Sequence, residues 1–121
     1  MSCMRILPIA LCVCLVAPAF AQDEPVPPSE IKESWVGKTL VGATASGAPA
    51  TLRLLPDGSA SVSAGSTSDT GTWRVSEQGY CTTWKNIRSG QERCFTVKRA
   101  GTKMTVFNLD GSVSGYFTEI K

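Results

Sequence analysis

The chain has 121 residues, and its 12 lysines and arginines against 10 aspartates and glutamates give a formal net charge of +2. It contains no histidine, which excludes Ser-His-Asp and Cys-His catalysis and most zinc catalysis. A nearly neutral chain without dense basic runs interleaved with aromatics is also not expected to bind nucleic acid.

Residues 1–21 have the pattern of a cleaved export signal. Arg5 supplies a positive start, residues 6–16 are almost wholly apolar, and small residues lead up to Ala21. We predict cleavage between Ala21 and Gln22. The apolar run is shorter than the roughly 20 residues of a spanning helix, so no stable membrane span is expected after cleavage. The predicted location is the periplasm of a Gram-negative bacterium, or the medium outside it.

Residues 22–34 are predicted to be a flexible, proline-rich, acidic leader. Its first part, QDEPVPPSE, contains three prolines and three acidic residues, and proline both fixes the backbone and removes hydrogen-bond donors. A short helical turn capped by Ser29 is expected over Ser29–Trp35. Residues 35–121 are predicted to form a single β-barrel-like domain.

Short strand-like runs separated by Gly, Pro, Asn and Asp fill the chain after Trp35. This rhythm predicts an all-β fold, a small antiparallel up-and-down barrel or meander of about eight strands with one disulfide; a two-sheet sandwich is the alternative. The polar stretch Gly65–Gly71 is expected to be an unstructured loop at one rim. The candidate strands are residues 38–44, 50–55, 59–64, 72–76, 80–86, 92–98, 103–109 and 112–120.

Two cysteines, Cys81 and Cys94, remain after the predicted cleavage. In an oxidising compartment they are expected to form a structural disulfide. The alternatives are weaker, because a redox pair needs a spacing such as C-x-x-C and a metal site needs more than two thiols. We therefore expect no metal site and no cofactor.

Pairing these cysteines in a hairpin fixes a register for the two strands. Tyr80 is then opposite Phe95, Trp84 is opposite Gln91, and residues 86–89 make a tight connection. Because side chains alternate along a strand, Tyr80, Trp84 and Phe95 are expected in the core. The disulfide is expected on the outer, polar face.

Basic residues gather in the second half of the chain. Most are expected to lie on a solvated strand face, but Lys85, Arg88 and Arg93 form a candidate interaction patch for an anionic partner, such as lipid head groups or an acidic protein. No catalytic residue is predicted, because most of the acidic side chains that could act as a pair sit at turns, where they are favoured for backbone reasons.

The three tryptophans of the predicted domain are Trp35, Trp73 and Trp84. They are expected to fill the barrel, since a small barrel is usually plugged by its own side chains. The alternative is that they line a ligand cavity.

A set of short motifs runs through residues 35–120: LPDG at 55–58, GTW at 71–73, CTTW at 81–84, CFTV at 94–97 and DG at 110–111. This pattern resembles a group of small exported proteobacterial β-domains of unknown function, and the resemblance implies no activity. The chain is more distantly similar to calycin-like barrels. SVSGYF at 112–117 is similar to periplasmic lysozyme inhibitors in its Ser-Gly and nearby aromatic.

The expected function is that of an uncharacterised, exported, non-enzymatic binding module for a protein or a cell-envelope component. An inhibitor of lysozyme or of a protease in the periplasm is the alternative. A small hydrolase that uses carboxylates is a third hypothesis.

Overall fold

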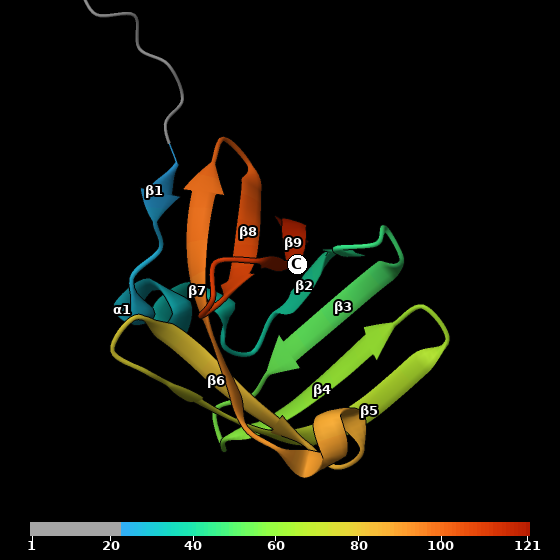
Figure 1. The fold of residues 1–121 in the computed structure, drawn as a ribbon. Helices are drawn as coiled ribbons and strands as arrows, with labels where there is room; N and C mark the ends of the chain where they lie inside the picture. Colours follow the sequence, from blue (N-terminus) through green and yellow to red (C-terminus); the bar gives the residue numbers. More distant parts are fainter. Residues whose placement is uncertain (1–22) are drawn as a thin grey trace, which may run out of the picture.

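The computed structural model describes residues 23–121, so the predicted signal and its cleavage site lie outside the described residues. Within this range nearly all regular structure is strand (Figure 1), and no helix is long and apolar enough to cross a membrane. The elements are β1 Glu24–Pro25, α1 Pro28–Glu30, the π-helical turn η2 Ile31–Trp35, β2 Thr39–Thr44, β3 Pro49–Leu54, β4 Ser59–Ala64, β5 Thr67–Val75, β6 Gly79–Trp84, the 3-10 turn η3 Ile87–Gly90, β7 Arg93–Ala100, β8 Lys103–Asn108 and β9 Val113–Ile120.

All nine described strands belong to one sheet with the order β1-β7-β6-β5-β4-β3-β2-β9-β8, and β8 also pairs with β7. The eight strands β2 to β9 therefore close into an antiparallel barrel, to which β1 is added beside β7 (Figure 1). The predicted all-β barrel is confirmed, and closure leaves no long free edge that would template aggregation.

Alternation and turn chemistry explain why these segments form strands. Along β3, Leu52 and Leu54 are buried and Arg53 between them is exposed. The Asp57 carboxylate accepts the Ser59 backbone N–H at 2.9 Å. The backbone at Gly58 has φ +89°, which favours glycine over any residue with a side chain. The β8–β9 turn repeats this arrangement.

The leader was predicted wrongly from Glu24 onward. Glu24 and Pro25 pair with Arg99 and Lys98 of β7, and the Val26 side chain that follows is buried. The carboxylate of Glu30 makes a bidentate ion pair with the guanidinium of Arg99. These contacts order a proline-rich segment because extended proline-containing chain suits an added edge strand.

The helical turn begins at Pro28, not at the predicted cap Ser29, and Pro27 occupies the cap position without a side-chain hydrogen bond. Ile31 and Trp35 on this turn have no exposed surface. Together with Leu40 and Leu54 they belong to the main core cluster. Since the turn leads directly into β2, it closes the end of the barrel at which β2 starts (Figure 1).

Residues 65–71 were expected to be an unstructured loop, and this is also corrected. Strand β5 starts at Thr67, and Ser63 of β4 pairs with Ser68. The side chains here are small and polar, so the hydrophobic pattern did not mark the strand. Pairing with β4 orders this segment as a strand, which its residue types alone do not predict.

The predicted hairpin register is confirmed at its centre, where Tyr80 pairs with Phe95 and Cys81 with Cys94. Its end differs from the prediction. The pairing of β6 with β7 ends at Thr82 and Arg93, so Trp84 does not pair with Gln91, and the connection from β6 to β7 contains the turn η3. On its other side β6 pairs with β5, where Trp84 is opposite Gly71. A Cβ atom on Gly71 would lie 1.9 Å from the Thr83 carbonyl oxygen, so the close approach of β5 to β6 requires glycine there.

Candidate ligand-binding site

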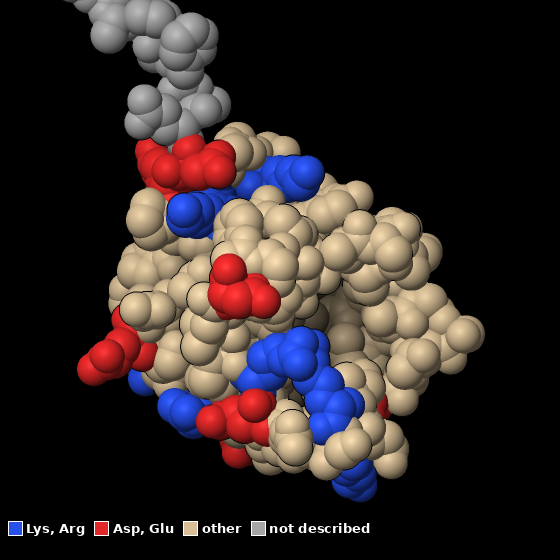
Figure 2. All heavy atoms as spheres, in the orientation of Figure 1, with Lys and Arg blue, Asp and Glu red and all other residues tan. Residues whose placement is uncertain are grey.

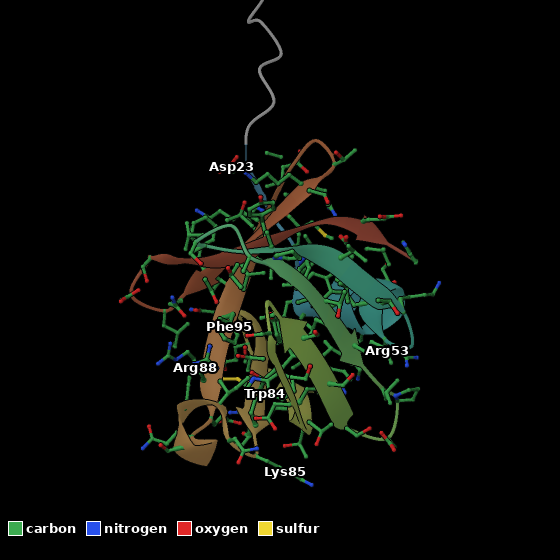
Figure 3. All side chains as sticks on the ribbon, turned by 90° about the vertical axis from the view of Figure 1, so that its right-hand side faces the viewer. Asp23, Arg53, Trp84, Lys85, Arg88 and Phe95 are labelled. Atoms are coloured by element: carbon green, nitrogen blue, oxygen red, sulfur yellow. A yellow bond between two sulfur atoms is a disulfide. The ribbon has the colours of Figure 1, made fainter. Side chains whose placement is uncertain are left out.

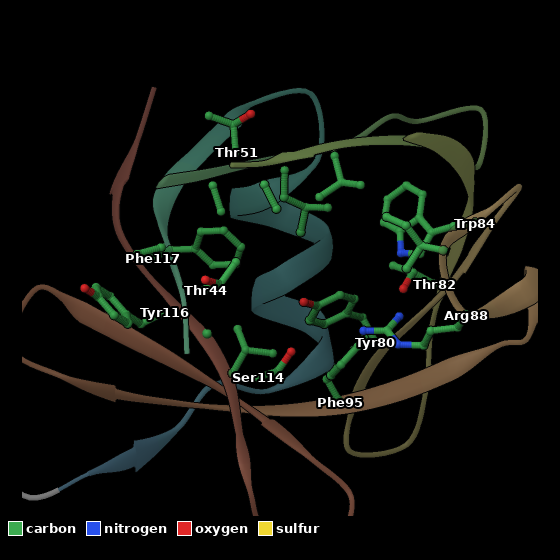
Figure 4. A pocket seen from close by; sticks show the side chains of 18 residues that line it. Thr44, Thr51, Tyr80, Thr82, Trp84, Arg88, Phe95, Ser114, Tyr116 and Phe117 are labelled. Carbon is green, nitrogen blue, oxygen red and sulfur yellow. The ribbon is translucent and has the colours of Figure 1, made fainter. Parts of the chain in front are cut away.

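A cavity of about 240 Å³ lies inside the barrel at the end opposite the helical turn. It is partly open to solvent, and most of its wall is apolar (Figure 4). Ala50 and Ala64, which pair with each other, occupy wall positions where larger side chains would fill the space. An eight-stranded barrel has room either for its own side chains or for one small ligand, and these small residues leave room for the ligand.

Aromatic side chains separate the cavity from the closed end. Tyr80 and Phe117 line it, and Trp35 packs edge-on beneath both, with ring centroids 5.5 Å from Tyr80 and 5.8 Å from Phe117. Burial raises the pKa of the Tyr80 hydroxyl far above its usual range, so this group stays neutral. In Figure 4 the hydroxyl points into the cavity.

The tryptophans divide between the two predicted roles. Trp35 fills the core as expected. Trp84 is also buried, but it forms part of the cavity wall, as in the alternative hypothesis. Trp73 is half-buried against the core and donates its indole N–H to the Leu55 carbonyl oxygen at 2.7 Å.

Arg88 is the charged side chain that lines the cavity. Its guanidinium lies 5.6 Å from the centroid of the Phe95 ring and points into the cavity beside Tyr80 (Figures 3 and 4). Its Nη1 atom is buried and has no hydrogen-bond partner among residues 23–121. Burial, and then the nearby charge of Arg93, lower the pKa of Arg88 from its ordinary value. The positive charge is therefore only partly compensated, through the face of the Phe95 ring.

The backbone that carries Arg88 is unusual. Arg88 has φ +56° and Ser89 has φ +54°, and the left-handed region costs an ordinary residue roughly 1–2 kcal/mol. Such conformations persist only where the surroundings hold them, and they cluster at functional sites.

Asp69 is the residue that holds this turn. Its carboxylate accepts the backbone N–H groups of Asn86 at 2.8 Å and Ile87 at 2.9 Å, and it also accepts the N–H of Thr70. These hydrogen bonds, that from Ile87 foremost, lower the pKa of Asp69 from its ordinary value. This role could not be predicted, because Asp69 lies 17 residues before Asn86 in a segment expected to be a loop.

The predicted interaction patch does not form one surface. Arg88 reaches into the cavity, whereas Arg93 and Lys85 are exposed. Lys85 points away from the barrel (Figure 3). Arg93 starts β7 at the open end and lies near enough to Asp110 to help lower the pKa of that carboxyl, after the hydrogen bonds from Ser112. Figure 2 shows a hollow in this face of the molecule with basic side chains along its lower border.

The disulfide between Cys81 and Cys94 is confirmed. Because Tyr80 and Thr82 face the cavity, Cys81 between them faces outward, yet it has no exposed surface. The carboxylate of Glu92 lies within 4.8 Å of both sulfur atoms and pairs with Arg74 at 2.8 Å. Two sulfur atoms that are bonded to each other offer no thiolate to a metal ion. Cys81, Cys94 and Glu92 are therefore a structural disulfide beside a carboxylate, and not a metal centre.

A catalytic carboxylate pair could be drawn from Asp57, Asp69, Glu77, Glu92 and Asp110, and all of these except Glu77 have structural partners among the described residues. Asp57 and Asp110 bind the backbone of their own turns, Glu92 pairs with Arg74, and Asp69 holds η3. These contacts account for their positions without a reaction.

Comparisons with known proteins identify no relative: no protein-family model, no curated protein and no solved structure matches the chain.

Proposed function

We propose that this protein is an exported, non-enzymatic binding module that takes a small molecule of the cell envelope into the open end of its barrel. The observation that carries the proposal is the cavity of about 240 Å³, closed below by aromatic rings and bordered by a partly buried cation. Ligand sites are typically apolar cavities with a few placed polar groups. Pockets for drug-sized molecules begin at roughly 300 Å³, so the expected ligand is smaller.

Export remains part of the proposal and is supported by the disulfide, which persists in oxidising compartments. The packed leader reduces support for the alternative of a protease inhibitor that uses a flexible arm, because the chain is paired or buried from Glu24 to Val26. Inhibition of lysozyme stays a separate prediction, checked by residual lysozyme activity at stoichiometric amounts of this protein.

The test of the proposed function is titration of the oxidised protein with 1-octanol, a neutral probe, followed by calorimetry and by tryptophan fluorescence, to which Trp84 of the cavity wall contributes. Saturable one-to-one binding is expected. Ala50→Leu fills the cavity and should weaken binding at least tenfold, since the added methyl and methylene groups occupy the ligand's space.

Ser61→Leu is the matched control, because Ser61 lies on β4 between the inward positions Ala60 and Val62 and so faces outward. It should bind octanol like the parent protein. The absence of saturable binding, or equal binding by the Ala50→Leu variant, would rule out the cavity as a ligand site.

A further inference from the structure

We propose that the ligand is a single-chain amphiphile with one anionic head group, a medium-chain carboxylate or alkyl phosphate, whose head binds the guanidinium of Arg88. This inference rests on the proposed function and adds the chemical class of the ligand. It comes from the unpartnered Nη1 atom of Arg88 in a cavity whose wall is mostly apolar.

The electrostatics of Arg88 favour an anion. A charge removed from water is costly unless it is paired and hydrogen-bonded, and Arg88 has its Nη1 buried without a partner among the described residues. The Phe95 ring at 5.6 Å supplies only a weak interaction, and Arg93 repels the charge. A carboxylate or phosphate fits the planar guanidinium with two parallel hydrogen bonds, which would complete the coordination of Arg88.

Two hydroxyl groups of the cavity wall also suit the anionic head group of the ligand. The Tyr80 hydroxyl points into the cavity (Figure 4), and burial keeps it neutral and able to donate a hydrogen bond. Thr82, which is buried in the same wall, adds a hydroxyl. The described acidic side chains do not line the cavity, so an anion there meets no facing carboxylate.

The size of the cavity limits the tail. At roughly 30 Å³ for each non-hydrogen atom, the share of one molecule in liquid water, the cavity of about 240 Å³ holds about eight such atoms. The packed rings of Trp35, Tyr80 and Phe117 block extension toward the closed end. Because two of these atoms are the oxygens of a carboxylate head, a carboxylate of about six carbons fills the space, and further carbons would have to lie outside it.

Backbone geometry indicates that Arg88 is held in place for this purpose. Two consecutive left-handed residues, Arg88 and Ser89, aim the side chain inward. The buried carboxylate of Asp69 fixes the preceding N–H groups at 2.8 and 2.9 Å. A pre-positioned cation loses less conformational entropy on binding than a free surface arginine.

The test is calorimetric titration with octanoate, octyl phosphate, 1-octanol and octylamine. Octanoate or octyl phosphate should bind about ten- to a hundredfold more tightly than octanol, the range for hydrogen bonds to a charged group, and octylamine should bind more weakly than octanol. The tighter of the two anions identifies the head group.

Variants assign the effect to Arg88. Arg88→Gln should remove the preference for the anions, measured as the ratio of octanoate affinity to octanol affinity, and Arg88→Lys should retain part of it because lysine keeps the charge but not the planar fork. Arg53→Gln is the matched control, since Arg53 is exposed on the outside of β3 and its loss should change nothing.

Chain length gives an independent readout. From butanoate to hexanoate each methylene should tighten binding by roughly fourfold, the value for burying one methylene, and dodecanoate should bind little more tightly than hexanoate.

Two results would overturn the inference while leaving the proposed function intact: neither octanoate nor octyl phosphate binding more tightly than octanol, or an unchanged anion preference in Arg88→Gln. Failure of every probe, octanol included, would overturn both.

Discussion

Asp69 links the stability of the fold to the position of the site. A buried carboxylate that accepts several backbone N–H groups is stabilised in its charged form, and the pKa of Asp69 is lowered accordingly. The same contacts fix the turn from which Arg88 projects. One side chain thus supports both the strand β5 and the cation of the proposed site.

Asp69→Asn is predicted to lower stability and flatten its dependence on pH. Because the folded-state pKa lies below the unfolded value near 3.9, the unfolded chain binds more protons in this range. The contribution is therefore complete above about pH 5 and is lost as pH falls through the folded-state pKa. Urea unfolding between pH 3 and 6 should show a smaller slope for the variant.

Asp57→Asn is the control for this prediction. Asp57 also has a lowered pKa, caused first by the Ser59 hydroxyl, but it sits in the β3–β4 turn away from the cavity. Both variants should reduce the pH slope, and only Asp69→Asn should also weaken octanoate binding. Equal octanoate affinity of the two variants would show that Asp69 does not position Arg88.

The individual residues of the candidate site were the part of the structure that the sequence predicted least well. Arg88 was grouped with Lys85 and Arg93 by proximity in the chain, but a left-handed backbone turns it inward. Neither Arg88 nor Ser89 is a glycine, so their residue types do not predict a left-handed backbone. The cavity was equally hidden, because alanine and glycine in strands do not indicate whether a neighbour or a ligand fills the space above them.

At the scale of elements, the hairpin β6–β7 was largely predictable. Alternation together with one disulfide fixed which residues pair and which face they share, and Tyr80 and Phe95 lie where expected. The connection between β6 and β7 was not predictable, because η3 depends on Asp69, which lies 18 residues before Ile87 in the sequence. The same reason explains β1 and the start of β5, which are ordered by pairing with β7 and β4 rather than by their own composition.

Reduction of the disulfide between Cys81 and Cys94 is predicted to destabilise the domain by about 3 kcal/mol, the chain-entropy value for a loop of this length. For a domain of this size that corresponds to a melting temperature roughly 10–20 °C lower. Thermal unfolding with and without dithiothreitol measures it. The double variant Cys81→Ala, Cys94→Ala should melt low in both conditions, and a parent protein insensitive to the reductant would contradict a stabilising role.

On the scale of the whole molecule, the fold followed from the spacing of turns. Eight runs of alternating side chains with Asp-Gly and similar turns lead to a meander, and a meander of eight strands closes to satisfy its edges. The two ends of this barrel differ. The turn from Pro28 to Trp35 closes one end through the buried side chains of Ile31 and Trp35. At the other end small wall residues leave a cavity into which Arg88 reaches.

The central claim, that the open end is the binding site, is tested most directly by nitrogen-15 amide spectra recorded during titration with octanoate. The account predicts saturable shifts concentrated in the cavity wall, at Ala50, Thr82, Ile87 and Gly115. Shifts centred instead on the outer surface around Thr70 and Lys85, or no saturable shifts, would contradict it.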